Sequence, residues 1–334
     1  MASATSAPAS KPRRQPTSKM PLILMAPAVL TFCLLSGYPI VRLVVNSFQK
    51  YGRAQLMGVP PEWVGGTNYA QAITNSNFPI VFVRTFVFMV IAVTLTIVLG
   101  SLVAMLMMKL NKFFRLFLSV GLLLAWAIPP LTAVIVWGWM IDSDYGVINY
   151  SLTQVGGTKF VALLNNLFDF VHRHVHWFGL HLPTNWMGHQ WLLNPVSFFA
   201  VLIVIIVWSG IPFIAFTVYA ALTGIPGEVK EAAAIDQAGP VRRFFLIELP
   251  YVRSVFLVLI VLSVIWDLTV FTQVVALQSS GGLAEQTSTL GVWIYNQGSA
   301  SGNIGLSSAA AVIMVILMLA ISILYVRQTL NEGE

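Results

Sequence analysis

The chain has 334 residues, of which 57% are hydrophobic and only 9% are charged. Because about a quarter of the residues in soluble domains are charged, this composition excludes a soluble globular protein and indicates an integral membrane protein. The net charge of +6 would suggest nucleic-acid binding in a soluble chain. Here the basic residues stand at the ends of apolar segments, where they set membrane orientation, so we expect no nucleic-acid partner.

Residues 1–20 are rich in Ser, Ala and Pro and include four basic residues. This composition is typical of a disordered tail, which we expect in the cytoplasm. A signal peptide is the alternative, since a basic region precedes an apolar one. The apolar run at residues 21–48 is too long for a cleavable segment and lacks a convincing cleavage site, which favours a retained first span.

Six apolar segments are long enough to cross a membrane, which takes about 20 residues each. They lie at residues 21–48, 79–108, 116–141, 197–223, 251–277 and 304–327. The N-terminal tail, the link 109–115 and the loop 226–250 carry basic residues, whereas the link 278–303 carries one charge, Glu285. The positive-inside rule therefore predicts that both termini and the 226–250 loop face the cytoplasm. Residues 21–327 form one all-α membrane domain in this interpretation.

Residues 142–196 form the longest predicted outer loop. Residues 160–178 within it place apolar side chains at helical spacing, which favours an amphipathic helix at the membrane surface. The loop contains all five histidines, namely His172, His174, His176, His181 and His189. Alternating histidines can bind zinc, but no cysteine or clear acidic partner completes a tetrahedral set. We therefore favour a solvated surface that meets an external partner over a metal site.

Residues 226–250 form the longest polar run between two apolar segments. Glu228 and Glu231 fall where the positive end of a helix dipole favours acids, and three alanines follow, which are strong helix formers. Gly239 followed by Pro240 predicts that this helix ends and another begins. The expected product is a compact helix–turn–helix that can insert into a groove of another protein, without a side chain suited to chemistry.

This loop resembles the EAA loop of ABC importer permeases, and in particular the carbohydrate-importer branch. The resemblance is carried by Glu231, Ala232, Ala233, Asp236, Gly239, Ile247, Leu249 and Pro250. One position departs from the branch, which usually has glycine directly after the aspartate, whereas this chain has Gln237. In that family the loop docks on the ATPase subunit. The resemblance thus implies coupling roles for Glu228, Glu231, Ala232, Ala233, Asp236, Gly239 and Pro250.

Other short elements resemble the same branch through their order along the chain, which extends the resemblance over residues 25–327. They are Tyr38-Pro39-Ile40, Trp63 to Tyr69, Ile128-Pro129-Pro130, Gly146 with Asn149, Trp208 with Pro212-Phe213, and Gly281-Gly282. The resemblance implies a MetI-like fold of six transmembrane helices in the bacterial inner membrane. It also implies a second permease as heterodimeric partner, two ATP-binding subunits, and an extracytoplasmic binding protein that delivers a di- or oligosaccharide. ATP is then used by partner subunits, and this chain binds no cofactor.

The sequence carries no pattern for an enzyme. Residues 156–159 contain glycines before a lysine, but the GxxxxGK[ST] spacing of a phosphate-binding loop is absent. No Ser/His/Asp arrangement stands out either. The alternative to an importer subunit is a self-sufficient secondary transporter or another polytopic membrane protein. A secondary transporter usually needs several ionisable residues within the bilayer, and Asp267 is the only acid deep in a predicted span.

The predicted fifth span carries groups suited to sugar binding, which uses aromatic faces and polar side chains. Helical spacing predicts Trp266, Thr269 and Gln273 along one face, with Asp267 beside it. An ionisable residue within a span costs about 2.5–3.5 kcal/mol on insertion scales and usually faces a cavity or a partner. Two interpretations of Asp267 stay open. It borders the sugar path, or it hydrogen-bonds a neighbouring helix or the partner permease.

The predicted orientation is testable by cysteine labelling in a Cys33→Ser background. A cysteine introduced at Gln237 should resist impermeant thiol reagents in intact cells, because the 226–250 loop is expected inside. A cysteine at His181 should react. Reversed labelling of the two positions would contradict both the orientation and the coupling role of the loop.

Overall fold

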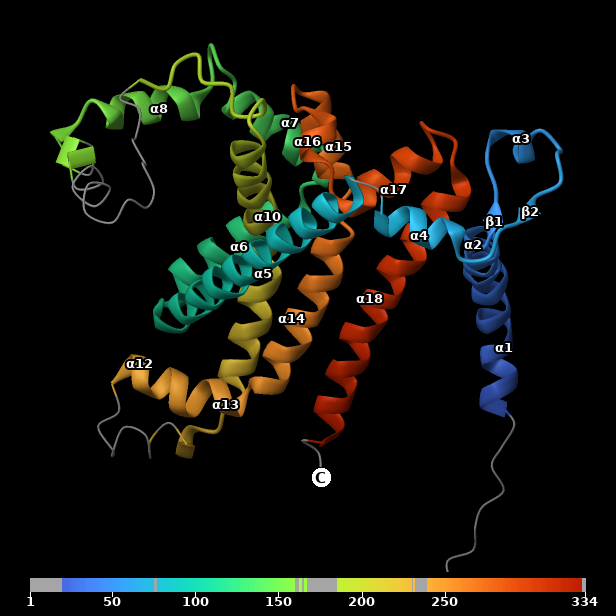
Figure 1. Cartoon of the computed structure of the whole chain (residues 1–334). Helices are drawn as coiled ribbons and strands as arrows, with labels where there is room; N and C mark the ends of the chain where they lie inside the picture. The colour runs from blue at the N-terminus through green and yellow to red at the C-terminus, as the bar shows by residue number, and fades with distance from the viewer. Residues whose placement is uncertain are drawn as a thin grey trace, which may run out of the picture.

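The computed structural model describes residues 20–74, 77–159, 162–163, 165–166, 185–229, 231 and 239–331. These residues are mostly helical (Figure 1), which confirms the predicted all-α class. The first part of the chain contains α1 (Met20–Phe32), the π-helix η1 (Cys33–Gly37), α2 (Tyr38–Ser47), β1 (Gln49–Lys50), α3 (Arg53–Leu56), β2 (Glu62–Trp63), α4 (Thr67–Thr74), α5 (Asn77–Lys109), α6 (Lys112–Ala127), α7 (Pro130–Met140) and α8 (Val147–Gly156).

The second part begins with the long helix α10 (Pro195–Thr223). Shorter elements follow before the last long helix, in the order α12 (Pro240–Arg243), the π-helix η2 (Phe244–Glu248), α13 (Leu249–Tyr251), α14 (Arg253–Leu268), α15 (Thr272–Ser279), α16 (Ala284–Thr287), α17 (Leu290–Gly298) and α18 (Ile304–Asn331). The amphipathic helix predicted at residues 160–178 lies mostly outside the described residues.

The six predicted apolar segments appear as four long helices and two bent pairs. The first pair is α6 with α7, which meet at an angle of 101°. The bend falls at Ile128-Pro129-Pro130, because proline lacks an amide hydrogen and disfavours helical geometry in the residue before it. The second pair joins the η2–α13 segment to α14 at 76°. By length and composition, each bent pair can serve as one span.

The predicted fifth span, residues 251–277, is wrong as a single helix. Helix α14 ends at Leu268 and α15 begins at Thr272. The Val270 carbonyl accepts a hydrogen bond from the Thr289 hydroxyl at 3.2 Å. A contact with a residue 19 positions away therefore satisfies a backbone group at the break. Local helical spacing carries no information about such a contact.

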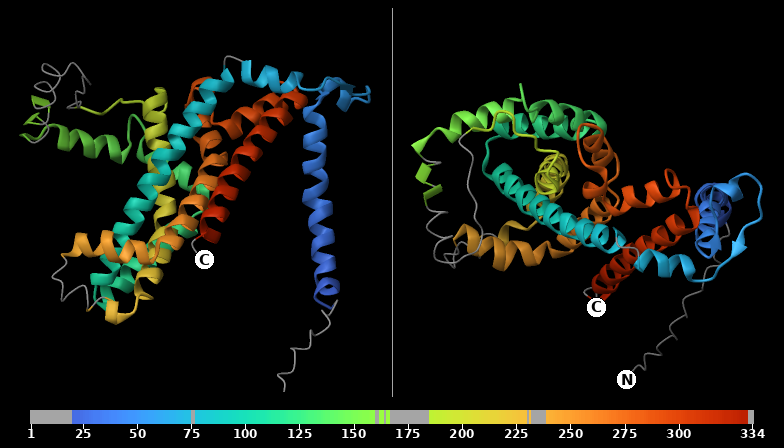
Figure 2. Two further views of the ribbon diagram at one scale, coloured as in Figure 1. Left: turned by 60° about the horizontal axis from the view of Figure 1, so that its bottom comes forward. Right: turned by 45° about the horizontal axis from the view of Figure 1, so that its top comes forward.

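The centre of the fold is the contact between α5 and α10, which cross and pack along their lengths (Figures 1 and 2). Two glycines allow the close approach. A Cβ atom on Gly100 of α5 would lie 2.6 Å from the Ile214 Cβ of α10. A Cβ atom on Gly210 of α10 would lie 2.8 Å from the Thr96 Cγ2 of α5. Small residues at such contacts let membrane helices pack backbone to backbone.

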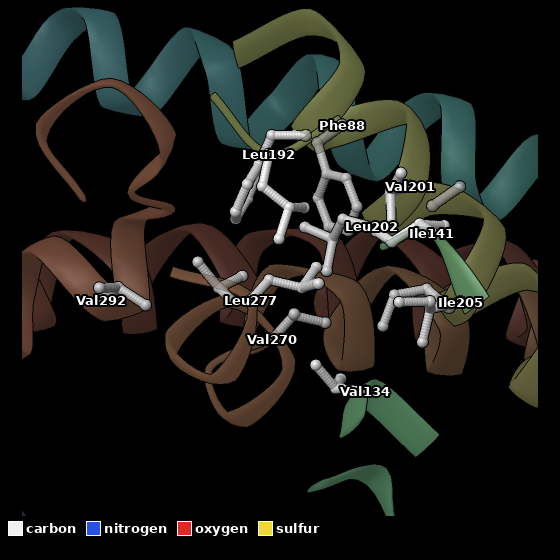
Figure 3. Close-up of a cluster of buried hydrophobic side chains, with 14 residues drawn as sticks. Phe88, Val134, Ile141, Leu192, Val201, Leu202, Ile205, Val270, Leu277 and Val292 are labelled. Atoms are coloured by element: carbon white, nitrogen blue, oxygen red, sulfur yellow. The ribbon is translucent and has the colours of Figure 1, made fainter. Parts of the chain in front are cut away.

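A buried apolar cluster joins this helix pair to α7 and α15. Figure 3 shows Phe88 of α5, Val134 of α7, Leu202 of α10 and Leu277 of α15 in this cluster. A second cluster, near the α12–α13 end, packs Phe244 of η2 against α10 and α14. A third cluster packs α5 against α17 and α18, with Phe78, Trp293 and Leu306 among its buried residues. Helix α5 contributes to all three clusters, and α10 contributes to the first two.

The first span is attached to the remainder at one end only. Helix α1 stands apart from the bundle (Figure 1 and the left view of Figure 2), and its residues 24–32 are all exposed. At the α2 end, the Asn68 side chain donates hydrogen bonds to the carbonyls of Ser47 and Gln49, both at 2.9 Å. The Tyr69 hydroxyl lies 2.7 Å from the Ser47 hydroxyl. The Trp63–Tyr69 element thus ties the end of the first span to α4.

The glycine contacts predict opposite effects of the same substitution at different sites. Gly100→Ala and Gly210→Ala should each destabilise the protein by about 1–3 kcal/mol, the usual cost of overpacking. Gly121→Ala on α6 is the matched control, since its Cβ would meet no atom within 4 Å, and it should stabilise the protein by about 0.5–1 kcal/mol, because alanine favours a helix interior over glycine. Thermal unfolding of the purified protein in detergent checks this. Equal midpoints for Gly100→Ala and Gly121→Ala would contradict the tight contact.

Candidate functional site

A cavity of about 250 Å³, hereafter the central cavity, lies where α6, α7, α10, α14 and α15 meet. Its wall combines aromatic, polar and apolar side chains. They are Trp126, Ile128, Pro130, Ala133, Ile205, Ile206, Ser209, Gly210, Phe213, Trp266, Asp267, Val270 and Gln273. The cavity thus lies at the α6–α7 bend and at the α14–α15 break. Non-helical backbone at membrane depth is tolerated where it is buried in protein or lines a cavity.

Three of the four predicted path residues meet in this cavity, but not in the predicted way. Trp266 and Asp267 come from the end of α14, whereas Gln273 comes from the start of α15. They converge because the chain changes direction after Leu268, and not because they share one helical face. Thr269 does not line the cavity, and its hydroxyl donates to the carbonyls of Ile265 and Trp266, both at 3.0 Å. The predicted shared face that included Thr269 is therefore wrong.

Asp267 is buried in the protein, with 7% of its surface exposed. Among the residues that the structure describes, its carboxylate has no hydrogen-bond or ion-pair partner. A contact with a neighbouring helix of the same chain is thus not seen. The carboxylate instead borders the central cavity, where its acceptor positions are available to a ligand or to another subunit.

Sequence reasoning missed the aromatic side chains that complete the cavity. Phe213 of α10 packs edge-on against Trp266, with ring centroids 5.2 Å apart. Trp126, at the end of α6, forms a further aromatic wall and is 58% exposed. The motif Ile128-Pro129-Pro130 and the pair Pro212-Phe213 were the available signals. The first motif forms the α6–α7 bend. The second contributes Phe213 to the cavity wall.

The segment Pro240–Tyr251, hereafter the coupling segment, runs across the end of the bundle as α12, η2 and α13 (Figure 1). Its first helix begins at Pro240, where the sequence predicted a helix start. The Arg243 Nε and Glu248 Oε1 atoms form an ion pair of 2.8 Å, and the Glu248 side chain is nearly buried. This pair spans η2, while Phe244 anchors η2 to the apolar cluster of α10 and α14.

The predicted coupling residues lie only partly within the described chain. Glu228, Glu231, Gly239 and Pro250 are exposed at the surface. Ala232, Ala233 and Asp236 lie outside the described residues, as does Gln237. Pro250 belongs to the coupling segment and Gly239 directly precedes it, whereas Glu228 and Glu231 follow the end of α10.

Residues 96–329 match the family model of the binding-protein-dependent transport system inner membrane component. The match covers more than half of the chain, including the central cavity and the coupling segment. The chain belongs to this family. It is a multi-pass membrane permease subunit of an ABC importer, and the ATPase is a separate subunit. The predicted family, and the prediction that the chain is not an enzyme, are thereby confirmed.

The permease is similar to several known proteins over most of its length. It is 34% identical over 314 residues to the diacetylchitobiose uptake system permease protein DasB of Streptomyces coelicolor, covering 94% of this chain and 88% of that protein. It is 28% identical to the sulfoquinovosyl glycerol transport system permease protein SmoG of Agrobacterium fabrum, covering 92% and 89% of the two chains.

A solved structure shares the fold. This is a chain of a bacterial ABC transporter involved in the import of the acidic polysaccharide alginate, with a TM-score of 0.70 and 17% identity. The match covers 95% of the permease and 97% of that chain. The predicted MetI-like permease fold is thus confirmed.

The histidine-rich loop of the permease is described only in part. His189 packs edge-on against Trp186 and Trp191, with ring centroids 5.3 and 4.8 Å away. His172, His174, His176 and His181 lie outside the described residues. Within the described chain, no group of three or more His, Cys, Asp or Glu residues could hold a metal ion.

The position of Asp267 predicts a charge-dependent effect on transport. Asp267→Asn keeps the size of the side chain but weakens hydrogen bonds to a ligand, which should lower uptake roughly fivefold, because a charged acceptor contributes about 1 kcal/mol more than a neutral one. Asp144→Asn, at an exposed acid outside the central cavity, is the control. Uptake and subunit co-purification are measured together. Unchanged uptake by an assembled Asp267→Asn complex would contradict a charge-dependent ligand contact, and loss of assembly would favour a packing role.

Proposed function

We propose that this permease imports a di- or oligosaccharide that an extracytoplasmic binding protein delivers, driven by ATP hydrolysis in two partner subunits. The observation that carries the proposal is the central cavity, where Trp266, Asp267 and Gln273 meet. Names of relatives support a carbohydrate cargo. The relatives transport diacetylchitobiose, sulfoquinovosyl glycerol and arabinooligosaccharides, according to those names.

The cavity wall has the chemistry that sugars require. Trp126, Phe213 and Trp266 offer aromatic surface to the apolar faces of sugar rings. Asp267 accepts hydrogen bonds from hydroxyl groups, and Gln273 can both donate and accept. Ligand sites typically combine a mostly apolar wall with a few placed polar groups in this way.

The basic residues support the proposed orientation in the membrane. Lys109, at the end of α5, lines the same apolar groove as Phe244 and Phe245 of η2. The basic link 109–115 and the coupling segment therefore share one end of the bundle. The positive-inside rule supports a cytoplasmic position for this end, where Glu228, Glu231, Gly239 and Pro250 would contact the ATPase. The same contact would include Ala232, Ala233 and Asp236.

A second permease would complete the assembly. The first span, Leu24–Ser47, buries Ser47 at its end but exposes most of its apolar side chains, among them Leu30, Phe32 and Leu35. Lipid covers part of such a helix. A related permease, forming a heterodimer with this chain, would supply a protein neighbour for it and the second wall of the transport path.

The coupling mechanism follows from the anchored segment. Phe244 packs the coupling segment against α10 and α14, and the Arg243–Glu248 ion pair stiffens the segment itself. Closure of the ATPases would move this segment as a rigid body. Because α14 carries Trp266 and Asp267, the same movement would reshape the central cavity. No residue of this chain needs to bind ATP or another cofactor for that.

Reconstituted uptake tests the proposal. The complete complex in proteoliposomes, with its loaded binding protein, should take up a di- or oligosaccharide only when ATP is supplied. The panel contains diacetylchitobiose, arabinooligosaccharides, maltose, trehalose and sn-glycerol-3-phosphate. Glu231→Lys should abolish most uptake while the subunits stay assembled, because it reverses the charge at the expected ATPase contact.

The matched control is Glu285→Lys, the same charge reversal in the predicted outer link 278–303. It should keep normal uptake. Uptake of sugar driven by an ion gradient, without ATP or binding protein, would overturn the proposal in favour of a secondary transporter. Preferred uptake of a non-sugar such as sn-glycerol-3-phosphate would overturn the carbohydrate assignment alone.

A further inference from the structure

A second cavity, of about 400 Å³, lies at the end of the bundle opposite the coupling segment. We call it the outer vestibule. Its wall is formed by α7, the turn that follows it, residues 190–193, and residues 280–281 directly after α15. Its volume falls within the range of about 300–1,000 Å³ that is typical of small-molecule sites. The predicted path residues do not line it.

The wall of the outer vestibule is fixed by one buried side chain, Asn149 of α8. Its amide nitrogen donates to the carbonyls of Asp142 and His189, at 3.0 and 3.2 Å. Its amide oxygen accepts from the Trp191 indole at 2.6 Å. Asn149 is fully buried. It therefore holds two segments, more than 40 positions apart, in one preformed wall.

Gly146 closes this arrangement. A Cβ atom there would lie 2.3 Å from the Asp142 carbonyl oxygen and 2.6 Å from its amide nitrogen, so only glycine fits. Gly146 allows the tight turn after α7, and Asn149 holds that turn against residues 189–191. Together they fix the shape of the outer vestibule. This explains why the turn needs both residue types.

The groups that the vestibule presents suit a carbohydrate. Trp139 lines it with a 67% exposed indole, a surface on which a sugar ring can stack. Asp142, Gln190 and Ser280 supply polar side chains. The Asp144 and Tyr145 amides donate to the Asp142 carboxylate at 2.9 and 3.2 Å and hold its pKa below the ordinary value.

Asp142 is therefore charged at neutral pH. A carboxylate has about four acceptor positions, so capacity remains for hydroxyl groups after these two bonds. The outer vestibule thus combines an aromatic face with acceptors and donors, as the central cavity does.

Two packed helices connect the two cavities. On α7, Pro130 borders the central cavity and Trp139 the outer vestibule. Gln273 of α15 borders the central cavity, and Ser280, directly after α15, borders the outer vestibule. An 11-residue helix such as α7 is about 16 Å long. Between the cavities lies the apolar cluster of Figure 3, with Val134 and Leu277, which separates them.

We propose that the outer vestibule is a carbohydrate subsite that receives one end of the sugar before it enters the central cavity. This inference rests on the proposed function. An oligosaccharide suits it better than a monosaccharide, since a chain can occupy the vestibule while its other end stays with the binding protein.

A matched pair of serines tests this directly, in a Cys33→Ser background. Ser280→Cys places a thiol in the vestibule, and Ser151→Cys places one on the exposed surface of α8, away from it. The purified complex, without binding protein, is labelled with an impermeant thiol reagent at rising concentrations of diacetylchitobiose, maltose or trehalose. A non-sugar osmolyte at equal osmolality is the solvent control.

Sugar should slow labelling of Ser280→Cys roughly threefold or more at saturation, because only the unoccupied fraction of sites reacts. Labelling of Ser151→Cys should not change. Trp139→Ala in the Ser280→Cys background should remove the protection, and Trp139→Phe, which retains an aromatic face, should keep it. This readout does not depend on transport, so an effect of Trp139 on gating alone would not produce it.

Each other outcome has a defined meaning. If the wild-type complex takes up a panel sugar but that sugar does not protect Ser280→Cys, the subsite is overturned and the proposed function stands. If only the binding protein protects Ser280→Cys, the vestibule is a protein-docking surface and the subsite is again overturned. If no sugar is taken up by the wild type, the proposed function fails and the subsite fails with it.

Discussion

The close approach of α5 and α10 is the constraint on which the remaining structure depends. Lipid tails are as apolar as leucine, so membrane helices associate through tight packing and polar contacts. Gly100 and Gly210 supply that packing reciprocally, each facing a β-branched residue of the other helix. Gly210 also lines the central cavity. A shift of α10 away from α5 would thus move one cavity wall and the two apolar clusters to which α10 contributes.

The central cavity lies where helices are interrupted. The α6–α7 bend at Pro129 and the α14–α15 break after Leu268 both open onto the central cavity. Backbone groups freed by such breaks need partners in a membrane, and the Thr289 hydroxyl provides one for Val270. Because α7 and α15 each extend from the central cavity to the outer vestibule, these two short helices link the points where a ligand would enter and rest.

The two ends of the molecule are stabilised by different contacts. At one end, Asn149 and Gly146 hold a preformed wall. At the other, the Arg243–Glu248 pair stiffens a segment whose neighbouring residues are exposed. In the proposed function, a rigid coupling segment would transmit the movement of the ATPases, and a preformed wall would limit the entropy that a ligand loses on binding. The exposed apolar side chains of α1 mark a surface that depends on lipid or another subunit.

The sequence by itself determined the class, the family and the apolar segments, because hydrophobic length, basic flanks and the Glu231 to Pro250 pattern are local properties. Proline positions also indicated the helix start at Pro240. Tertiary structure alone decided which residues meet. Gln273 joins Trp266 and Asp267 only because the chain breaks after Leu268, and helical spacing wrongly added Thr269. The outer vestibule could not be predicted from the sequence either, because Asn149 joins segments that lie far apart in the chain.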